Sequence, residues 1–369
     1  MSKLIDIIAG ARPNFMKIAP IIRAVERDST TNCFFEYRLV HTGQHYDEKL
    51  SDTFFDQLGI PAPHVNLGVG SGTQAEQTSS IMIGYEKQLI QKKSDLCLVV
   101  GDVTSTMACA ITAQKLGIPV AHVEAGIRSG DWSMPEEINR MVTDSITNYF
   151  FTTSEYANEN LKNSGVGSDR IFFVGNTMID TLLANIHRLR KPSFWDEYSL
   201  TEKEYVVLTM HRPSNVDVGS SLEQKLKAIA VGTRGLPIVF PVHPRTAKVL
   251  KDMDDLPDSV HLVDPQSYLE FNYLVKNSKA VITDSGGITE ETTVLGVPCI
   301  TLRDSTERPE TVHQGTNELI GTDPRAIEPA FEKLFEGKWK KGSIPVKWDG
   351  RAGERIVAHL MALLKQVKN

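Results

Sequence analysis

Short apolar runs, separated by longer amphipathic stretches, are the feature that most limits how this chain can fold. A strand that is apolar at nearly every position is covered on both faces, which is typical of a parallel sheet between layers of helices. The first half has such runs at residues 4–10, 35–41, 95–102, 119–125, 149–154 and 170–175. The second half repeats them at residues 205–210, 237–243, 260–264, 280–284 and 298–304. The pattern predicts an α/β protein with two doubly wound, Rossmann-like domains.

A polar stretch without a strand pattern, residues 183–204, separates the two sets of runs. We therefore expect an N-terminal Rossmann-like domain over residues 1–175 and a C-terminal Rossmann-like domain over 176–352. The last segment, 353–369, is amphipathic, and we expect it to form a helix that packs back on the first domain. Residues 94–126 and 278–304 share one plan of strand, Asp, polar turn, helix and strand. That similarity indicates either an internal repeat or the common form of any βαβ unit.

Composition and charge exclude several classes of protein. The net charge of −6 argues against a nucleic-acid or membrane-surface binder, and no apolar run reaches membrane-spanning length. The N-terminal segment lacks a signal-peptide layout, and the four cysteines form no CxxC pair. We therefore expect a cytoplasmic protein with reduced cysteines, no metal site, no nucleic-acid partner and no membrane partner.

Charged residues follow nearly every predicted strand, where open α/β sheets bind their ligands. If the two domains face each other, these strand ends line one cleft. The candidates are Arg12, Lys17, Asp102, Glu124, Arg128, Glu136, Glu137, His211, His243 and Arg303. Each has an ordinary alternative: Asp102 can cap a helix, the two glutamates after Pro135 suit a helix start, and the histidines can be core residues. What favours a site is that so many strand ends carry such groups.

The stretch VITDSGGITEE, residues 281–291, predicts a strand that ends at Asp284 and a helix that starts beside Ser285, Gly286 and Gly287. Free backbone N–H groups at a helix N-terminus bind anions, and glycine lets a ligand approach the backbone. Glu290 or Glu291 can reach a ribose diol, and the aromatic residues of 264–275 offer a face for a base. A nucleoside diphosphate, with or without a sugar, is the ligand that these residues favour.

Taken together, seven motifs resemble the non-hydrolysing UDP-N-acetylglucosamine 2-epimerases. They are GARPNFMKIAP, GD before a Thr/Ser run, HVEAGIRSG with PEEINR, MHRPSN, DPQSYLEF, TDSGGITEE and RDSTERPETV, and they span about residues 10–323 in family order. The resemblance implies the GT-B fold, a homodimer, and interconversion of UDP-GlcNAc and UDP-ManNAc with no cofactor. It places Asp102, Glu124, Glu136 and His211 among the catalytic residues. With Arg128 from the strand-end pattern, the expected substrate contacts are Arg12, Lys17, Arg128, His243, Phe271, Ser285, Gly286, Gly287 and Glu291.

The chemistry explains why such a set is needed. The C2 proton of the sugar has no carbonyl beside it, so direct deprotonation near neutral pH is not feasible. If UDP leaves from C1, positive charge acidifies the C2 proton, and 2-acetamidoglucal forms; UDP then adds again after protonation of the other face. The candidate proton carriers are Asp102, Glu124 and Glu136, and the sequence does not assign them to faces.

Two departures from the family pattern keep alternatives open. Asn14 stands where many relatives have Glu, and residues 44–47 differ from the segment of substrate-activated members. TGQHYDEKL and VHPRT are closer to the branch that epimerises UDP-2,3-diacetamido-2,3-dideoxyglucuronate, whereas ERPE and GTNELIGTD are closer to the GlcNAc branch. The other readings are a GT-B glycosyltransferase and a non-catalytic UDP-sugar sensor.

Overall fold

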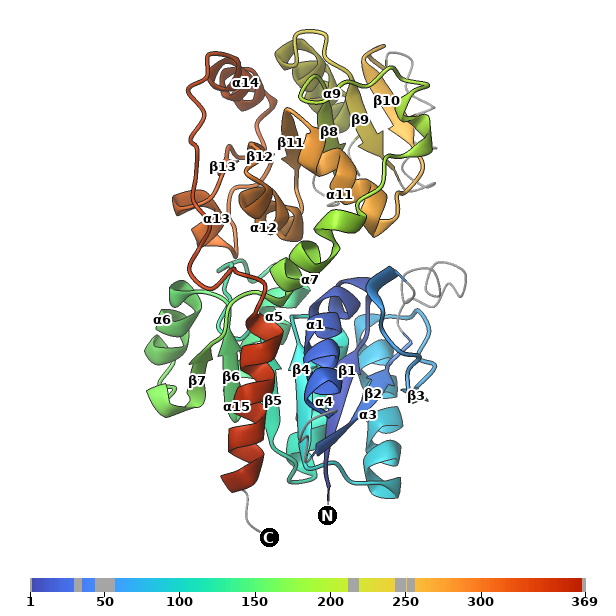
Figure 1. The fold of residues 1–369 in the computed structure, drawn as a ribbon, viewed down its shortest axis with the longest axis vertical. Helices are drawn as coiled ribbons and strands as arrows, with labels where there is room; N and C mark the ends of the chain where they lie inside the picture. The colour runs from blue at the N-terminus through green and yellow to red at the C-terminus, as the bar shows by residue number, and fades with distance from the viewer. Residues whose placement is uncertain are drawn as a thin grey trace. The chain divides into compact units, whose positions relative to one another are not determined.

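The computed structural model describes residues 2–29, 35–43, 57–211, 219–242, 250 and 256–366. The chain divides into two compact units: Met1–Ala184 with Val346–Asn369, and Asn185–Pro345. Each unit holds one sheet in which every strand pairs in parallel with its neighbours, and helices cover the sheet (Figure 1). The predicted class, α/β with two doubly wound units, is confirmed.

The first unit contains a seven-stranded sheet with the order β3-β2-β1-β4-β5-β6-β7. The order reverses between β1 and β4, and such a switch point is where doubly wound sheets bind ligands. The strands are β1 (Lys3–Ala9), β2 (Phe35–His41), β3 (Val65–Asn66), β4 (Leu96–Val100), β5 (Val120–Val123), β6 (Tyr149–Thr152) and β7 (Ile171–Phe173).

Helices cover both faces of this sheet, which is why its strands are apolar throughout. All five residues of β4 are buried, and Cys97 and Val99 share a core with Ile81 and Tyr85 of α3. The helices are α1 (Arg12–Ser29), α3 (Gln74–Gln91), α4 (Thr104–Lys115), α5 (Pro135–Ile146), α6 (Glu155–Asn163), α7 (Thr177–Asn185) and α15 (Ala352–Gln366), with the 3-10 turn η1 (Ser168–Arg170).

The C-terminal helix α15 lies against α1 in the first unit (Figure 1). The two helices approach so closely that a Cβ on Gly353 would stand 2.6 Å from the carbonyl oxygen of Pro20. Asp180 of α7 accepts hydrogen bonds from the backbone N–H groups of Ala352 (3.1 Å) and Gly353 (2.7 Å). The indole of Trp348 is buried and donates to the carbonyl of Thr153. These contacts fix the start of α15 just after the chain returns from the second unit to the first at Val346.

The second unit contains a six-stranded sheet with the order β10-β9-β8-β11-β12-β13, which reverses between β8 and β11. Its strands are β8 (Val206–Thr209), β9 (Ile238–Pro241), β10 (Val260–Val263), β11 (Ala280–Thr283), β12 (Cys299–Thr301) and β13 (Asn317–Leu319). Its helices are α9 (Gly219–Gly232), α11 (Tyr268–Asn277), α12 (Gly286–Leu295), α13 (Pro309–His313) and α14 (Ile327–Phe335), with 3-10 turns η2 (Ile186–Arg188), η3 (Ser193–Trp195) and η4 (Pro324–Ala326).

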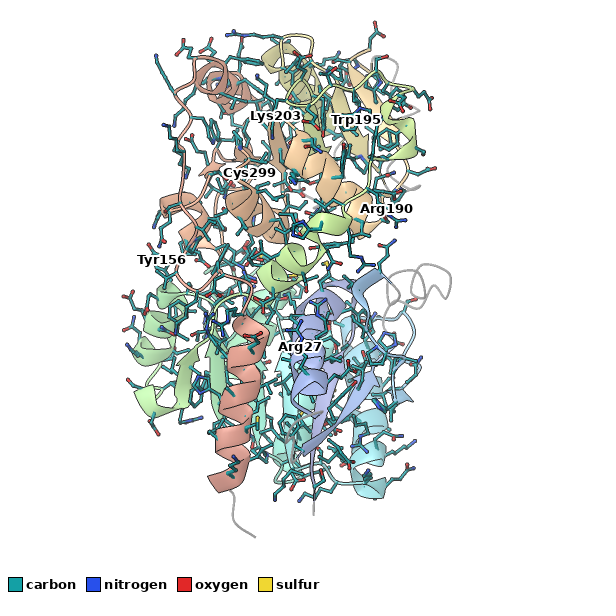
Figure 2. All side chains as sticks on the ribbon, in the orientation of Figure 1. Arg27, Tyr156, Arg190, Trp195, Lys203 and Cys299 are labelled. Carbon is teal, nitrogen blue, oxygen red and sulfur yellow. The ribbon has the colours of Figure 1, made fainter. Side chains whose placement is uncertain are left out.

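Strand β8 shows why the second sheet is also apolar at successive positions. Val206 and Leu208 belong to a core with residues of α9 and α14. Val207 belongs to a second core, which includes Trp195, labelled in Figure 2. The ring of Trp195 packs edge-on against that of Tyr205, with 5.3 Å between the ring centroids. No helix in the described parts of the chain is both long enough and apolar enough to cross a bilayer.

Candidate active site

The strand ends of the first unit hold an ion pair between two predicted site residues. Lys17, on α1 after β1, places its Nζ 2.6 Å from Oε2 of Glu124, which follows β5. Both side chains are buried, and burial of an unpaired charge would be costly. Each residue therefore supplies the opposite charge that the other needs at this buried sheet edge beside the switch point.

The backbone of Glu124 is strained, which a sequence does not reveal. Its φ is +69°, in the left-handed region that residues other than glycine seldom adopt. Strain of this kind persists where surrounding contacts enforce it and is concentrated at functional sites. Gly101 contributes space: a Cβ there would stand 3.0 Å from Nζ of Lys17 and 3.7 Å from Oε2 of Glu124.

Asp102 lies next to Gly101 and is held by a buried arginine. Arg140 of α5 donates from Nη1 to Oδ2 of Asp102 at 2.6 Å, and from Nε to Oε2 of Glu137 at 2.9 Å. The side chain of Asp102 is 28% exposed, whereas that of Arg140 is only 2% exposed. Asp102 is thus a fixed carboxylate that still reaches solvent. Sequence reasoning assigned no role to Arg140, although its i+3 spacing from Glu137 is a helix-face signal.

The structure separates the two glutamates at the start of α5. Glu137 is buried and accepts hydrogen bonds from the N–H groups of Ser129 and Gly130. Burial raises the pKa of Glu137, but these bonds and the charge of Arg140 lower it overall. Glu136, the predicted catalytic residue, is exposed in the first turn of the helix. A carboxylate at this position also interacts favourably with the helix dipole, which would explain Glu136 without catalysis. The catalytic role of Glu136 therefore stays a prediction.

Arg128, predicted to bind substrate, forms an ion pair within the first unit. Its Nη1 lies 2.6 Å from Oδ2 of Asp144 on α5. Asp144 also contacts Nδ1 of His122 at 2.7 Å, and the other ring nitrogen of His122 lies 2.8 Å from the carbonyl oxygen of Gly101. Burial raises the pKa of Asp144, but its bond to His122 and the charges of His122 and Arg128 lower it overall. This buried network supports the loop that carries Asp102.

Asn14, the departure from the family pattern, has a structural role. Its Oδ1 accepts from the N–H groups of Gly10 (3.1 Å) and Ala11 (3.0 Å), and its Nδ2 donates to the carbonyl of Val100 (3.0 Å). The side chain therefore ties the turn after β1 to the end of β4. A deprotonated glutamate lacks the donor that Val100 requires.

In the second unit, the predicted anion site is the N-terminus of α12. Ser285 is the N-cap residue, its side chain makes no capping hydrogen bond, and the first turn carries no acidic residue. A Cβ on Gly287 would meet no atom within 4 Å. The backbone N–H groups at this end have the geometry and the partial positive charge that favour a phosphate.

His211 and Asp284 form a pair beside this helix end. Nδ1 of His211 lies 2.8 Å from Oδ1 of Asp284, and the backbone N–H of His211 donates to both carboxylate oxygens. Asp284 is fully buried, whereas the ring of His211 is 64% exposed. The pKa of Lys225 on α9 is lowered overall, because burial lowers it more than the charge of Asp284 raises it. Sequence reasoning saw Asp284 only as a strand end, yet a carboxylate that fixes an imidazole tautomer is a common catalytic device.

Glu291, predicted to bind the ribose, is buried opposite α11. Its Oε1 accepts from Nδ2 of Asn272 at 3.3 Å. Burial raises its pKa to about 7, despite hydrogen bonds from Asn272 and Tyr268. Glu290 points to a different partner, because its Oε1 accepts from Nε of Arg308. Of the two glutamates, Glu291 is the one that shares its surroundings with α11, the helix of Phe271.

Three predictions fall wholly or partly outside the described residues. Arg12 is the first residue of α1, but its side chain is not described. His243 and the segment 44–47 are also outside the described residues. Phe271 is described and packs partly buried against the core around Val207. A base contact by Phe271 stays a prediction.

The two units thus present different functional groups at their strand ends. The first presents carboxylates whose charges are balanced by lysine or arginine, and such groups are suited to accept and return protons. The second presents an anion-binding helix end with an adjacent imidazole and carboxylate, which is suited to bind a diphosphate and stabilise its departure.

Comparison with known proteins agrees with these two sets of functional groups. The family described as UDP-N-acetylglucosamine 2-epimerase matches residues 27–361. A UDP-N-acetylglucosamine 2-epimerase of Methanocaldococcus jannaschii is 42% identical, and the alignment covers 96% of this chain and 97% of that protein. A UDP-2,3-diacetamido-2,3-dideoxy-D-glucuronate 2-epimerase of Pseudomonas aeruginosa is 36% identical, with 98% and 100% covered.

A solved structure supports the same assignment. The crystal structure of the M. jannaschii UDP-GlcNAc 2-epimerase, in complex with UDP-GlcNAc and UDP, superposes with a TM-score of 0.87. That chain is 41% identical, and the match covers 97% of this chain and 99% of that one. The resemblance noted in the sequence is therefore confirmed, and this chain belongs to the UDP-N-acetylglucosamine 2-epimerase family.

Proposed function

We propose that this protein interconverts UDP-GlcNAc and UDP-ManNAc as an isomerase that uses no redox cofactor. The observation that carries the proposal is the uncapped N-terminus of α12 beside the His211–Asp284 pair. This arrangement suits a diphosphate that must both bind and leave. The high identity to a protein named UDP-N-acetylglucosamine 2-epimerase supports the choice of sugar.

The reaction proceeds by elimination and re-addition. A carboxylate removes the C2 proton, the C2–H electron pair becomes the C1=C2 bond, and the C1–O pair leaves with UDP. The intermediate is 2-acetamidoglucal. Protonation of C2 on the opposite face and attack by the UDP oxygen on C1 give the epimer. Each acid/base step contributes roughly 10²–10⁴-fold.

Departure of UDP is the task of the second unit. The β-phosphate gains negative charge as the C1–O bond breaks, and the α12 N–H groups stabilise that charge. His211 donates Nδ1–H to Asp284, so its second ring nitrogen serves the departing group. Glu291 and Phe271 hold the ribose and the base.

Proton transfer is the task of the first unit. Glu124 and Asp102 are each held in place by a cationic partner, Lys17 and Arg140, and a carboxylate in a fixed position can act as a general base. Glu136 is the third candidate. Assignment of these acids to the two faces of the sugar stays open.

A second substrate has specific support. The P. aeruginosa relative, named for a 2,3-diacetamido uronate, is 36% identical over the full length of that protein. The segments TGQHYDEKL and VHPRT favour that branch, and both lie largely outside the described residues. Assembly as a homodimer is a further prediction from the resemblance, and a cytoplasmic location is the prediction made from composition and the cysteine pattern.

The test is incubation with each UDP-sugar in D₂O, without acceptor or cofactor. We expect UDP-ManNAc from UDP-GlcNAc with deuterium at C2, because carboxylate protons exchange with solvent. ¹⁸O placed in the C1–O–P bridge should scramble into the non-bridging β-phosphate oxygens. Epimerisation of the diacetamido uronate alone would select the second substrate. Product without C2 deuterium, or with the bridging label intact, would contradict elimination.

A further inference from the structure

A buried ion pair faces the N-terminus of α12 from a neighbouring loop. Arg303 follows β12, and Glu307 lies in the loop before α13. Nη2 of Arg303 donates to Oε2 of Glu307 at 2.7 Å, and the two side chains are 3% and 12% exposed. The pair therefore lies inside the second unit, beside the proposed phosphate site.

The Glu307 carboxylate fills the space that Gly286 leaves at the first residue of α12. A Cβ on Gly286 would overlap Oε1 of Glu307, and it would stand 3.6 Å from Nη1 of Arg303. A carboxylate at this place interacts favourably with the positive end of the helix. In the protein alone, Glu307 is thus an anion at the helix end where the ligand's diphosphate is expected.

Two nitrogen atoms of Arg303 are buried hydrogen-bond donors that Glu307 does not use. Its Nε and Nη1 are buried and find no hydrogen-bond acceptor among the residues that the structure describes. Nη1 is also the atom directed toward Gly286. Buried donors on a charged group are nearly always satisfied, so such atoms at an anion site indicate contact with a ligand oxygen.

The local charge explains why one carboxylate has to give way. Arg303 pairs with Glu307, and Arg308 pairs with Glu290. The charges of these four side chains therefore balance in the protein without a diphosphate. Glu290 is fixed within α12 and is 1% exposed, whereas Glu307 is on a loop. Burial raises the pKa of Glu307, but Arg303 and Arg308 lower it to about 2. At neutral pH, Glu307 therefore carries its negative charge in the protein without ligand.

We propose that Glu307 is an internal anion that positions Arg303 in the free protein and yields to the diphosphate, which Arg303 then binds. This inference rests on the proposed UDP-sugar function and adds a competitor and a ligand to its binding site. Binding of a diphosphate then exchanges one anion for another at Arg303. The carboxylate lowers the affinity for UDP while keeping the site ordered.

The experiment measures binding of UDP, inorganic pyrophosphate and uridine by calorimetry. Glu307→Gln should tighten UDP and pyrophosphate binding by roughly three- to tenfold, because a competing charge is lost. Uridine binding should stay unchanged, because uridine carries no phosphate. Arg303→Met should weaken UDP at least about tenfold, again without affecting uridine. Glu307→Asp, which keeps the charge, should resemble the wild type more closely than Glu307→Gln does.

The outcomes separate the two proposals. Failure of the wild-type protein to bind UDP would overturn the proposed function itself. If the wild type binds UDP but Glu307→Gln binds it equally or more weakly at unchanged uridine affinity, Glu307 is no competitor. If Glu307→Gln also loses uridine binding, the substitution has damaged the fold, and Arg303→Met then decides the test. In that case, an affinity of Arg303→Met for UDP equal to that of the wild type overturns the inference. Glu318→Gln, which removes the Lys333 partner in the same unit, is the matched control and should change none of these affinities.

Discussion

The strand ends of the two units share a topology but differ in how they treat charge. Both sheets are parallel and reverse their order next to the first strand of the unit. In the first unit, Glu124 and Asp102 are each fixed by a cation from another element. In the second, a helix end without a side-chain cap faces a buried Arg303. The difference shows that the residues directly after the strands, rather than the sheet, decide the chemistry.

The largest effect should follow from removing the proton acceptor of the first unit. Glu124→Gln keeps an oxygen for Lys17 but cannot take a proton, so kcat should fall by roughly 10²–10⁴-fold. UDP affinity should change less than kcat, because the helix end that binds the diphosphate lies in the second unit. Steady-state kinetics and calorimetry check this, with Glu86→Gln on the exposed face of α3 as the control. A kcat within tenfold of the wild type would remove Glu124 from the mechanism.

A smaller loss should follow in the second unit from Asp284→Asn. The amide no longer fixes the His211 ring as a carboxylate does, and Lys225 loses its buried counter-charge. We expect kcat to fall by roughly 10–100-fold, together with a lower melting temperature. His211→Asn should lower turnover more than UDP affinity. Because Asp284 acts through His211, the double variant should be no slower than His211→Asn alone, and additive losses would contradict the pairing.

The two glycines of the helix end should respond differently. Gly287→Val adds a branched side chain where the protein offers open space, so it should weaken UDP binding by roughly tenfold with little change in melting temperature. Gly286→Val instead displaces Glu307 and Arg303, so it should lower the melting temperature as well. Thermal melts with and without UDP distinguish them. Equal loss of stability in both variants would show that the helix end is only a packing site.

The smallest effect concerns pH and Glu291. Its folded pKa of about 7 exceeds the ordinary value of 4.5, so between these values the folded protein keeps a proton that the unfolded chain has released. Stability therefore falls as pH rises through this window. Glu291→Gln removes that loss, on the order of 1–3 kcal/mol. Its melting temperature relative to the wild type should rise from pH 5 to pH 7.5; a constant difference would show that Glu291 titrates normally.

The strands were predictable because coverage on both faces requires apolar residues at successive positions, as β4 and β8 show. The placement of Lys17 and Glu124 at strand ends followed from the same pattern. Their contact did not, because it joins residues 107 positions apart. The burial of Glu137 rather than Glu136 depends on the rotation of α5, which adjacent glutamates do not encode. Glu307 was missed because its ion pair with Arg303 lies beside Gly286, and a sequence does not show that this loop and the start of α12 lie side by side.

The docking of α15 on α1 has a consequence for synthesis of the chain. The first unit is completed by residues that follow the whole second unit, because Asp180 accepts hydrogen bonds from the backbone N–H groups of Ala352 and Gly353. At about 5–20 residues per second, a ribosome needs on the order of ten to thirty seconds to make the intervening segment. During that time, the backbone of Pro20 on α1 lacks its neighbour Gly353, and the N-terminal unit lacks its last helix. The part of the chain made first is therefore the part finished last.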